Sequence, residues 1–339
     1  MEHNPLVSVI ILNWNGQKYL KDCLISLESQ SYKNFELILV DNGSKDESVF
    51  FVKQNFKNVI IIANKKNYGF AKGNNIGISS AKGSYIFLVN NDTRVEKNCI
   101  KNLMKIAEKK KTAGMFAPKI LSFENPKLID STGLNIYRDG LARGRGRLEI
   151  DAGQYNDKLE ILIPSGCAAL YRKKMLKEVG LFDEIFFAYC EDTDLGLRGR
   201  LMGWKCLFVP SAVVYHHYSG STGKFSEIKA FLAERNHFWV VFKNFPLSIL
   251  ILLPFYTLLR YLFIILGIIE NKGPAAKFKG SKIKLIAILI KAYASFAVKL
   301  PYIIRKRILI QKTKKISSKE IKLLIKKHRL NLKEITFLE

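Results

Sequence analysis

Two acidic segments, far apart in the sequence, carry side chains that could do chemistry. The first is NNDT at residues 90–93, which includes Asp92 and directly follows an apolar run. The second is EDTD at residues 191–194, which includes Asp192. Carboxylate and amide oxygens suit a hard divalent ion that is shared with substrate phosphates, and a carboxylate can also take a proton from a hydroxyl as a general base. The sequence therefore offers candidates for a metal ligand and for a base.

Both segments also have purely structural explanations. A lone acid after a strand often caps the next turn, and this would account for Asp92. The helix macrodipole favours acids in the first turn of a helix, and this alone would account for Asp194. Because Asp194 and Arg198 stand four positions apart, we also expect them to form an ion pair on one helix face.

Two adjacent histidines, His216 and His217, follow another apolar run and are candidate ligands. Neighbouring residues on a strand point to opposite faces, so only one of the two could enter a site. A hydrogen-bonded structural role explains a histidine in a strand equally well.

The elements that would position these residues are predicted from hydrophobic patterns. Four short apolar runs occur early in the chain, at residues 7–12, 35–40, 59–62 and 85–89. Such runs are typical of strands buried on both faces of a parallel sheet. Helical patterns lie between them, and the second is predicted to begin with Ser44 as N-cap and Glu47 at the capping-box position. This alternation predicts an α/β fold with an open, mostly parallel sheet.

Small polar residues follow each of the four predicted strands, for example Asn13, Asp41 and Asp92. In open α/β sheets, ligands bind beyond the carboxyl ends of the strands. Asn, Asp and Gly could merely make the turns after single strands. Small polar residues at the ends of all four predicted strands favour one shared polar crevice instead.

A glycine-bearing stretch, NYGFAKGNNIG, follows the third run and contains Gly69, Gly73 and Gly77. It matches neither GxGxxG nor a P-loop. Backbone amides at such a helix start could still hold a phosphate, with Lys72 close by. Small residues that allow close packing of a helix on a sheet are an equally good explanation.

The charge of the chain calls for an anionic partner. The formal net charge is +26, and residues 271–339 contain 19 Lys/Arg and 3 Glu, a net charge of +16. The five cysteines form no CxxC pair, which favours a reduced, cytosolic compartment. No basic segment precedes the first apolar run, so we expect no signal peptide.

The last part of the chain contains two further apolar stretches. Residues 246–269 are long enough to cross a bilayer, but Pro254 and Arg260 interrupt them. Residues 283–304 carry Lys284, Lys291 and Lys299 toward one helical face, which predicts a helix lying in an anionic membrane interface. A helical cap on the preceding domain is the alternative, and whether the first stretch spans the membrane stays open. No aromatic–basic platform for nucleic acid accompanies the lysines.

Four motifs in this order, VSVIILNWN, LVDNGS, NYGFAKGNN and LVNNDT, resemble those of family 2 glycosyltransferases. The likeness covers roughly residues 5–246 and is greatest to the rhamnosyltransferase-like branch. It implies an inverting enzyme with a Rossmann-like GT-A fold at residues 1–245, with residues 246–339 as a helical, membrane-associating tail. The implied reaction moves a sugar from a nucleotide-diphosphate sugar to a glycan or lipid-linked glycan acceptor in cell-surface polysaccharide synthesis. The implied location is the cytoplasmic face of the cell membrane.

The same resemblance implies roles for individual residues. Asp192 would be the catalytic base and Glu191 would orient it or touch the acceptor, while Asp92 and His216 would bind Mg²⁺ or Mn²⁺. Residues 165–169 would border the donor sugar and the acceptor, and Ser221 and Thr222 would lie in the loop after His216. The nucleotide and its diphosphate would contact Asn13, Asn15, Asp41, Asn67, Gly69, Lys72, Gly73, Asn74, Asn91 and Arg235.

The sequence departs from the family at one position, because Asn90 replaces the first acid of the family's DxD motif. One negative charge fewer would then face a bound metal ion. A catalytically silent relative, acting as a scaffold or lipid-binding subunit of a polysaccharide assembly complex, is the alternative function. Such a relative would have no need for both Asp92 and Asp192.

Overall fold

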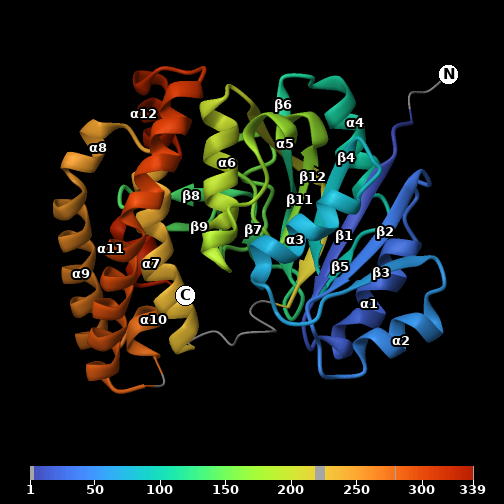
Figure 1. Ribbon diagram of the computed structural model, residues 1–339, viewed down its shortest axis with the longest axis horizontal. Coiled ribbons are helices and arrows are strands. Elements are labelled where there is room, and N and C mark those ends of the chain that lie inside the picture. Colours follow the sequence, from blue (N-terminus) through green and yellow to red (C-terminus); the bar gives the residue numbers. More distant parts are fainter. Residues whose placement is uncertain (1–3, 218–225, 279, 339) are drawn as a thin grey trace.

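The computed structural model of the protein describes residues 4–217, 226–278 and 280–338, and it contains a large mixed sheet with helices on both faces (Figure 1). The strands are β1 Val7–Asn13, β2 Phe35–Asp41, β3 Val59–Ala63, β4 Tyr85–Asn90, β5 Thr93–Val95, β6 Ala113–Ser122, β7 Ile129–Ser131, β8 Leu134–Ile136, β9 Ala142–Gly144, β10 Glu160–Ile161, β11 Ala168–Arg172 and β12 Lys205–His216. The helices are α1 Gln17–Glu28, α2 Ser48–Asn55, α3 Gly69–Ser80, α4 Cys99–Lys109, α5 Lys173–Val179, the 3₁₀ turn η1 Glu184–Phe186, α6 Glu191–Leu201, α7 Glu227–Asn244, α8 Leu247–Ile251, α9 Leu253–Ile269, α10 Gly273–Ala276, α11 Lys282–Thr313, α12 Ser318–Lys327 and α13 Leu332–Thr336.

The predicted α/β fold is confirmed, and the four early strands fall within one residue of the predicted runs. The sheet order is β10-β12-β6-β11-β4-β1-β2-β3. Strands β1, β2, β3 and β4 are parallel to one another, whereas β11 is antiparallel to both β4 and β6. All four early strands therefore end at one edge of the sheet, and β11 begins at that edge.

This arrangement brings later parts of the chain to the same edge. The backbone N–H of Asn90, at the end of β4, donates to the carbonyl of Cys167, just before β11. Strand β12 ends there as well, because it is parallel to β6 and its last residue, His216, pairs with Thr93. The sheet topology thus brings residues 90–93, 165–167 and 216 close together.

The core has three parts. Two hydrophobic clusters lie on the two faces of the sheet, and successive strand residues alternate between them, as Val9 and Ile10 do. A third cluster is formed largely by helices and includes Trp239 of α7, Ile303 of α11 and Ile321 of α12. Because this third core draws residues from both sides of position 245, the tail is packed on the rest of the chain (Figure 1).

One local prediction was wrong. Ser44 does not cap the second helix, which begins at Ser48 without a side-chain cap. The Ser44 hydroxyl donates instead to the carboxylate of Asp41 at 2.6 Å. Asp46 contacts the first residue of the helix, because its carboxylate accepts hydrogen bonds from the backbone N–H and the hydroxyl of Ser48.

The first apolar stretch of the tail is divided. Helix α8 ends at Ile251 and α9 begins at Leu253, with Pro254 in its first turn. Among the described residues, no helix combines the length and apolar character that crossing a membrane requires. The second stretch belongs to α11, whose 32 residues include Pro301.

Candidate functional site

The ends of β1, β2 and β4 are joined by a network of buried side chains. The side-chain amide of Asn13 donates to Asp41 Oδ1 at 2.9 Å, and the amide of Asn91 donates to Asn13 Oδ1 at 2.6 Å. Ser44 donates to both oxygens of Asp41, through its hydroxyl and its backbone N–H. Asn15, at φ +49°, completes the turn by accepting from the Lys45 N–H. The polar residues at the ends of β1, β2 and β4 thus contact one another, as the hypothesis of a shared crevice requires.

A second network surrounds Asn42, a polar residue at the end of β2 to which the sequence assigned no individual contact. Its amide donates to Asn67 Oδ1 and to the carbonyl of Gly69, both at 3.0 Å. Its own Oδ1 accepts from the amide of Asn64 and the N–H of Tyr68. Asn42 therefore sets the path of the chain into α3, and Asn67 and Gly69 lie beside it.

The remaining donor residues on α3 have mixed surroundings. A Cβ atom at Gly73 would lie 2.4 Å from a methyl of Leu12, so this glycine permits close packing of the helix on the sheet. Asn74 is buried and donates to the carbonyl of Phe70. Lys72 is half-exposed and lies 3.4 Å from Glu184. The packing explanation therefore accounts for Gly73, while Lys72 keeps a charge at the start of α3.

Asp92 and His216 lie side by side, with the ring Nε2 atom 3.5 Å from Asp92 Oδ1. Asp130 of β7, which we did not predict, holds the other side of the ring, with its Oδ2 atom 2.7 Å from Nδ1. Although burial opposes ionisation, His216 and the charge of Arg147 hold the pKa of Asp130 below its usual value. Although burial lowers the pKa of His216, the nearby Cys167, Asp130 and Asp92 raise it well above its usual value. The ring therefore favours a proton on both nitrogens, and a divalent ion at Nε2 would have to displace one of them. His217 lies apart, with Nδ1 3.0 Å from Glu124 and its ring stacked on Phe123.

The pair formed by Asp92 and His216 fits a divalent ion. Asp92 Oδ1 is buried and accepts no hydrogen bond from the part of the chain that the structure describes. Its ion pair with the His216 ring, at 3.5 Å, is long, and a cation between the two side chains would interact with Oδ1 more closely. No cluster of three or more His, Cys, Asp or Glu side chains that could hold a metal ion is found in the described ranges. Oxygen atoms of a diphosphate would have to supply other ligands.

Asp192 lies at the start of α6 and faces a glycine. Its Oδ2 accepts from the backbone N–H of Gly166 at 2.8 Å, and its Oδ1 accepts from the N–H and hydroxyl of Thr193. Burial raises the pKa of Asp192, and these hydrogen bonds offset the rise only in part. A Cβ atom at Gly166 would approach Oδ2 to 3.1 Å, so position 166 must stay small for this contact.

Glu191, the neighbour of Asp192, is buried, and its Oε2 has no hydrogen-bond partner among the described residues. Burial, reinforced by the charge of Asp192, raises the pKa of Glu191 well above its usual value. The surroundings of Glu191 therefore favour its protonated form, whereas Asp192 receives hydrogen bonds that favour its ionised form.

A short loop, residues 165–167, connects the two acidic sites. Gly166 binds Asp192, and the thiol of Cys167 interacts with His216, which contacts Asp92. Asp92 and Asp192 are thus linked through one loop, Asp192 directly and Asp92 by way of His216. A run of small residues before a strand, PSGCA, is the weak signal for this loop in the sequence.

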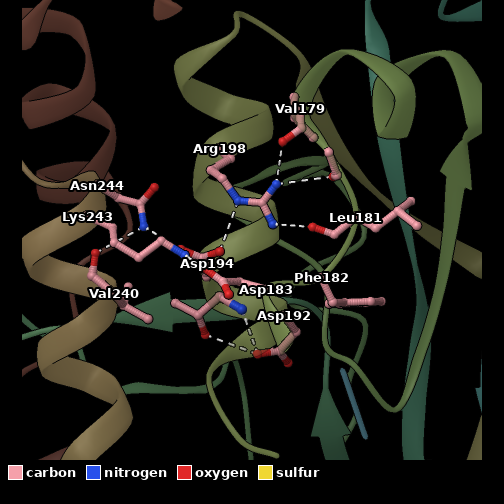
Figure 2. Close-up of polar contacts among 12 residues, drawn as sticks. Val179, Leu181, Phe182, Asp183, Asp192, Asp194, Arg198, Val240, Lys243 and Asn244 are labelled. Atoms are coloured by element: carbon pink, nitrogen blue, oxygen red, sulfur yellow. Dashed lines mark hydrogen bonds and ion pairs between the residues drawn. The ribbon is translucent and has the colours of Figure 1, made fainter. Parts of the chain in front are cut away.

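Asp194 has a different environment from Asp192, although both are on α6 (Figure 2). Arg198 donates to its Oδ2 at 2.9 Å, as the spacing predicted, and Lys243 lies 2.8 Å from its Oδ1. Burial alone would raise the pKa of Asp194, but the charges of Lys243 and Arg198 lower it to about 2. Figure 2 shows this cluster joining α6 to α7, with Asp192 directed elsewhere.

Arg235 and Asn236 of α7 hold the segment in front of Asp192. The Asn236 amide lies 2.7–3.0 Å from the carbonyls of three residues of this segment, Phe186, Ala188 and Tyr189. The segment is strained, since Phe187, Tyr189 and Cys190 have φ values of +63°, +69° and +67°. Arg235 donates to the same Phe186 carbonyl and stacks on Trp239. We missed Asn236 because an isolated Asn within a helical pattern gives no functional signal.

Two predicted loop residues, Ser221 and Thr222, lie outside the described residues. The other predicted residues form four groups. These are Asn13, Asn15, Asp41 and Asn91; Asn67, Gly69, Lys72, Gly73 and Asn74 around α3; Asp92 with His216; and Glu191 with Asp192, near Arg235.

Comparison with known proteins identifies the family. The model of glycosyl transferase family 2 matches residues 8–180, just over half of the chain, so the protein belongs to this family. The matched part includes Asp92 and the 165–167 loop and ends before Asp192. The predicted family is thereby confirmed.

The protein is similar to several bacterial sequences. An uncharacterised glycosyltransferase of Rickettsia prowazekii is 28% identical over 215 residues, which cover 63% of this chain and 62% of that protein. The N-acetylglucosaminyl-diphospho-decaprenol L-rhamnosyltransferase of Mycobacterium tuberculosis is 26% identical over 264 residues, covering 69% of this chain and 86% of that enzyme. The chain spans 62% and 59% of the length of the first two curated relatives that it matches.

Solved structures support the fold. The mannosyltransferase PcManGT of Pyrobaculum calidifontis, in complex with GDP-Man and Mn²⁺, superposes with a TM-score of 0.53 at 16% identity, covering 92% of this chain and 86% of that one. GalNAc-T7, with UDP, GalNAc and Mn²⁺, has a TM-score of 0.57 at 19% identity, covering 71% of this chain and 48% of that one. At these identities the likeness establishes a GT-A-like fold.

Proposed function

We propose that the protein is an inverting glycosyltransferase that moves a sugar from a nucleotide-diphosphate sugar to a hydroxyl of a glycan or lipid-linked glycan. The observation that carries this proposal is the pairing of Asp92–His216 with Glu191–Asp192 across the 165–167 loop. Membership of family 2 supports the reaction class. A silent scaffold would have no need for a buried Asp92–His216 pair and a base that both contact this loop.

The donor would lie along the ends of β1, β2 and β4, in keeping with binding beyond the carboxyl ends of parallel strands. Asp41 and Asn13 would line the part that receives the base and ribose, and Asn67 and Lys72 the part that receives the diphosphate. A structural neighbour contains GDP-Man and Mn²⁺, which supports a donor of this class. Lys72 is the half-exposed cation at this end of α3, so its charge is accessible to a phosphate.

Asp92 and His216 would hold the divalent ion, and Asp130 would keep the His216 ring in position. When bound there, Mg²⁺ or Mn²⁺ would offset the negative charge that develops on the departing diphosphate. Because Asn90 stands where the family has the first acid of its DxD motif, the affinity for the ion would depend strongly on His216.

Asp192 would act as the general base. The acceptor hydroxyl gives its proton to the Asp192 carboxylate while its oxygen forms a bond to the anomeric carbon. The bond from that carbon to the diphosphate breaks on the opposite face, so the configuration inverts and the electron pair leaves with the diphosphate. Burial makes Asp192 a stronger base than a surface aspartate, and the Gly166 N–H fixes the orientation of its carboxylate.

The raised pKa of Glu191 favours Asp192 as the proton acceptor, because a protonated carboxyl would add no second negative charge. The mycobacterial relative is named as a rhamnosyltransferase that acts on a diphospho-decaprenol, which supports a hexosyl donor, with rhamnose to be tried first, and a role in cell-surface polysaccharide synthesis.

The test is a screen of nucleotide sugars for Mn²⁺-dependent binding and hydrolysis by the full chain. We expect Asp92→Ala to weaken metal-dependent donor binding at least about tenfold, since ligand loss removes most of a two-residue metal site. Asp157→Ala, at an exposed aspartate away from the loop, is the matched control and should bind as the wild type does. Metal-dependent binding that persists in Asp92→Ala would overturn the assignment of the metal site.

A further inference from the structure

Helix α9 has two very different sides. One side presents only large apolar residues to the exterior at a spacing of three to four residues, and these are Phe255, Leu258, Leu262, Ile265, Leu266 and Ile269. Such a stripe is the pattern of a helix face that is covered by an apolar medium. No part of the described chain covers it, because these side chains are all exposed.

The opposite side of α9 is fixed to the protein by Arg260, which is fully buried. Its Nε atom donates to Asp139 at 2.5 Å, and its Nη1 and Nη2 atoms donate to the two oxygens of Glu234 at 2.7 and 2.9 Å. Separating a buried arginine from two carboxylates would leave all three charges unpaired, which is strongly unfavourable. Helix α9 therefore cannot rotate its apolar stripe inward or leave the protein to cross a bilayer.

Helix α11 repeats the pattern. Its buried side includes Ile288, Ala292 and Ile303, whereas the exposed side carries a second apolar stripe along the helix. The exposed stripe consists of Ile283, Ile286, Ile290, Ala294, Ala297, Pro301, Ile304 and Ile308, again spaced by three or four residues. The hydroxyls of Tyr261 and Tyr293 are 3.0 Å apart, which places α9 beside α11. In Figure 1, α8, α9 and α11 lie at the end of the molecule far from β2 and β3.

The charge of this region indicates what covers it. Lys282, Lys284, Lys291 and Lys299 are exposed on α11, around the apolar stripe. Residues 271–339 carry a net charge of +16, so two copies facing one another through this surface would repel. An apolar surface surrounded by cations matches a bilayer with anionic headgroups, where lysines meet phosphate and apolar side chains meet acyl chains.

We propose that the exposed stripes of α9 and α11 form a monotopic docking surface that sits in the interface of an anionic lipid bilayer. The helices lie along the membrane and do not span it, because Arg260 keeps the other side of α9 on the protein. This surface does not depend on the glycosyltransferase reaction. One further step rests on the proposed function: the membrane, at its cytoplasmic face, would be the partner that presents a lipid-linked acceptor to the enzyme.

The docking surface is also connected to the active site through α7. Glu234 of α7 binds Arg260, and the next two residues, Arg235 and Asn236, hold the segment in front of Asp192. A surface attached to the same helix would bring the acceptor side of the site near the membrane.

The test is flotation of the full chain with vesicles of phosphatidylcholine that contain either no anionic lipid or about 30 mol% phosphatidylglycerol. We expect binding to the anionic vesicles at about 0.1 M salt and release as the salt concentration rises. Leu262→Glu on α9 and Ile290→Glu on α11, at side chains 48% and 65% exposed, should each lower the bound fraction about tenfold or more. Both sites face outward, so the variants should fold, which circular dichroism checks.

Phe50→Glu on α2 is the matched control, since this residue is an exposed large apolar side chain on the sheet region. It should bind vesicles as the wild type does. Failure of the wild type to float with anionic vesicles would overturn the proposal. A wild-type dimer that Leu262→Glu converts to a monomer, without vesicle binding, would also overturn it and identify a second copy as the occupant. Flotation reports on docking alone, whereas donor hydrolysis in solution reports on the proposed reaction, so the two can fail separately.

The depth of insertion tests the monotopic geometry. In Leu262→Trp, the new tryptophan should be quenched more strongly by lipids brominated near the headgroup than by lipids brominated near the end of the acyl chain. Stronger quenching by the deep bromines would contradict an interfacial position for α9. Wild type, which has no tryptophan in α9, provides the background signal.

Discussion

The regions around Asp194 and Asp192 lie on one turn of α6 and have opposite electrostatics. Asp194 is paired with Arg198 and Lys243, and its pKa is lowered to about 2 (Figure 2). Within the part of the chain that the structure describes, Asp192 accepts hydrogen bonds from Gly166 and Thr193 and is paired with no cation, and burial raises its pKa. A carboxylate that is neutralised stabilises the fold, whereas one that is buried without a cation keeps its basicity.

The two acids differ because their partners come from distant parts of the sequence. Lys243 comes from α7 and Gly166 from the loop before β11, so neither is a neighbour of α6 in the sequence. Structural and catalytic roles can therefore be assigned to acids two positions apart only when the packing of other elements is known.

Asp192→Asn should lower sugar transfer about 10²–10⁴-fold, because the amide cannot accept the acceptor's proton. The amide oxygen can still accept the Gly166 N–H, so donor binding and thermal stability should be retained. Transfer rates and donor affinity measured on the same preparation separate these effects. Transfer within a few-fold of wild type would remove Asp192 as the base.

Asp194→Asn should act on stability. The change leaves Arg198 and Lys243 buried beside a neutral group, which we expect to cost about 3–5 kcal/mol of the free energy of unfolding. Chemical denaturation measures the loss, with the exposed Asp157→Asn as control. Unchanged stability would show that the cluster does not hold α6 to α7.

The pH dependence of the Asp194 contribution has a defined sign. Its pKa is about 2 in the folded protein, below the usual 3.8, so its stabilisation is present above about pH 4 and is lost as the pH falls toward 2. The stability difference between wild type and Asp194→Asn should therefore shrink over this acidic range. A difference that stays constant would contradict an ionised, paired Asp194.

Asp130→Asn should weaken Mn²⁺ binding about 10–100-fold by releasing the ring of His216. Glu124→Gln is the matched control, because Glu124 holds the neighbouring His217 at the surface. Calorimetric titration of Mn²⁺ in the presence of a nucleoside diphosphate measures both. A purely structural Asp130 would instead give a lower melting temperature with unchanged metal affinity.

Glu191→Gln should raise the free energy of unfolding at about pH 7 by about 1–2 kcal/mol, since an amide has no charge to lose on burial. The folded pKa of Glu191 lies above the usual 4.5, so its destabilising effect appears as the pH rises above 4.5 and is absent below it. The gain should therefore vanish at about pH 4. A destabilised Glu191→Gln at neutral pH would contradict a neutral Glu191.

The sequence predicted the parts of the fold that follow from local patterns. Runs such as Tyr85–Val89 are apolar on both faces, and strands buried in a parallel sheet are recognisable by that property alone. The start of α2 was predicted wrongly, because the sequence alone does not distinguish Ser44 from Asp46 as the residue that contacts the beginning of the helix. The hydrogen bond from Ser44 to Asp41, which depends on the turn between β2 and α2, decides between them.

The site was predictable only as far as residue type and motif order allow. Asp92 and Asp192 could be selected because acids after a strand and at a helix start carry recognisable chemistry. Asp130, Asn42 and Asn236 could not, since each acts through a partner that is far away in the sequence. The ion pairs of Arg260 were equally hidden, because its carboxylate partners lie on α7 and before β9.

Whether Asp92 and Asp192 belong to one active site can be tested with a crystal structure. The full chain would be crystallised with a nucleoside diphosphate and Mn²⁺, and the data recorded at the manganese absorption edge. We predict one anomalous peak between Asp92 and His216, with the diphosphate along the 165–167 loop and the Asp192 carboxylate facing the space where the sugar would be. An anomalous peak away from Asp92, or a diphosphate bound on a surface that Asp192 does not face, would contradict the account.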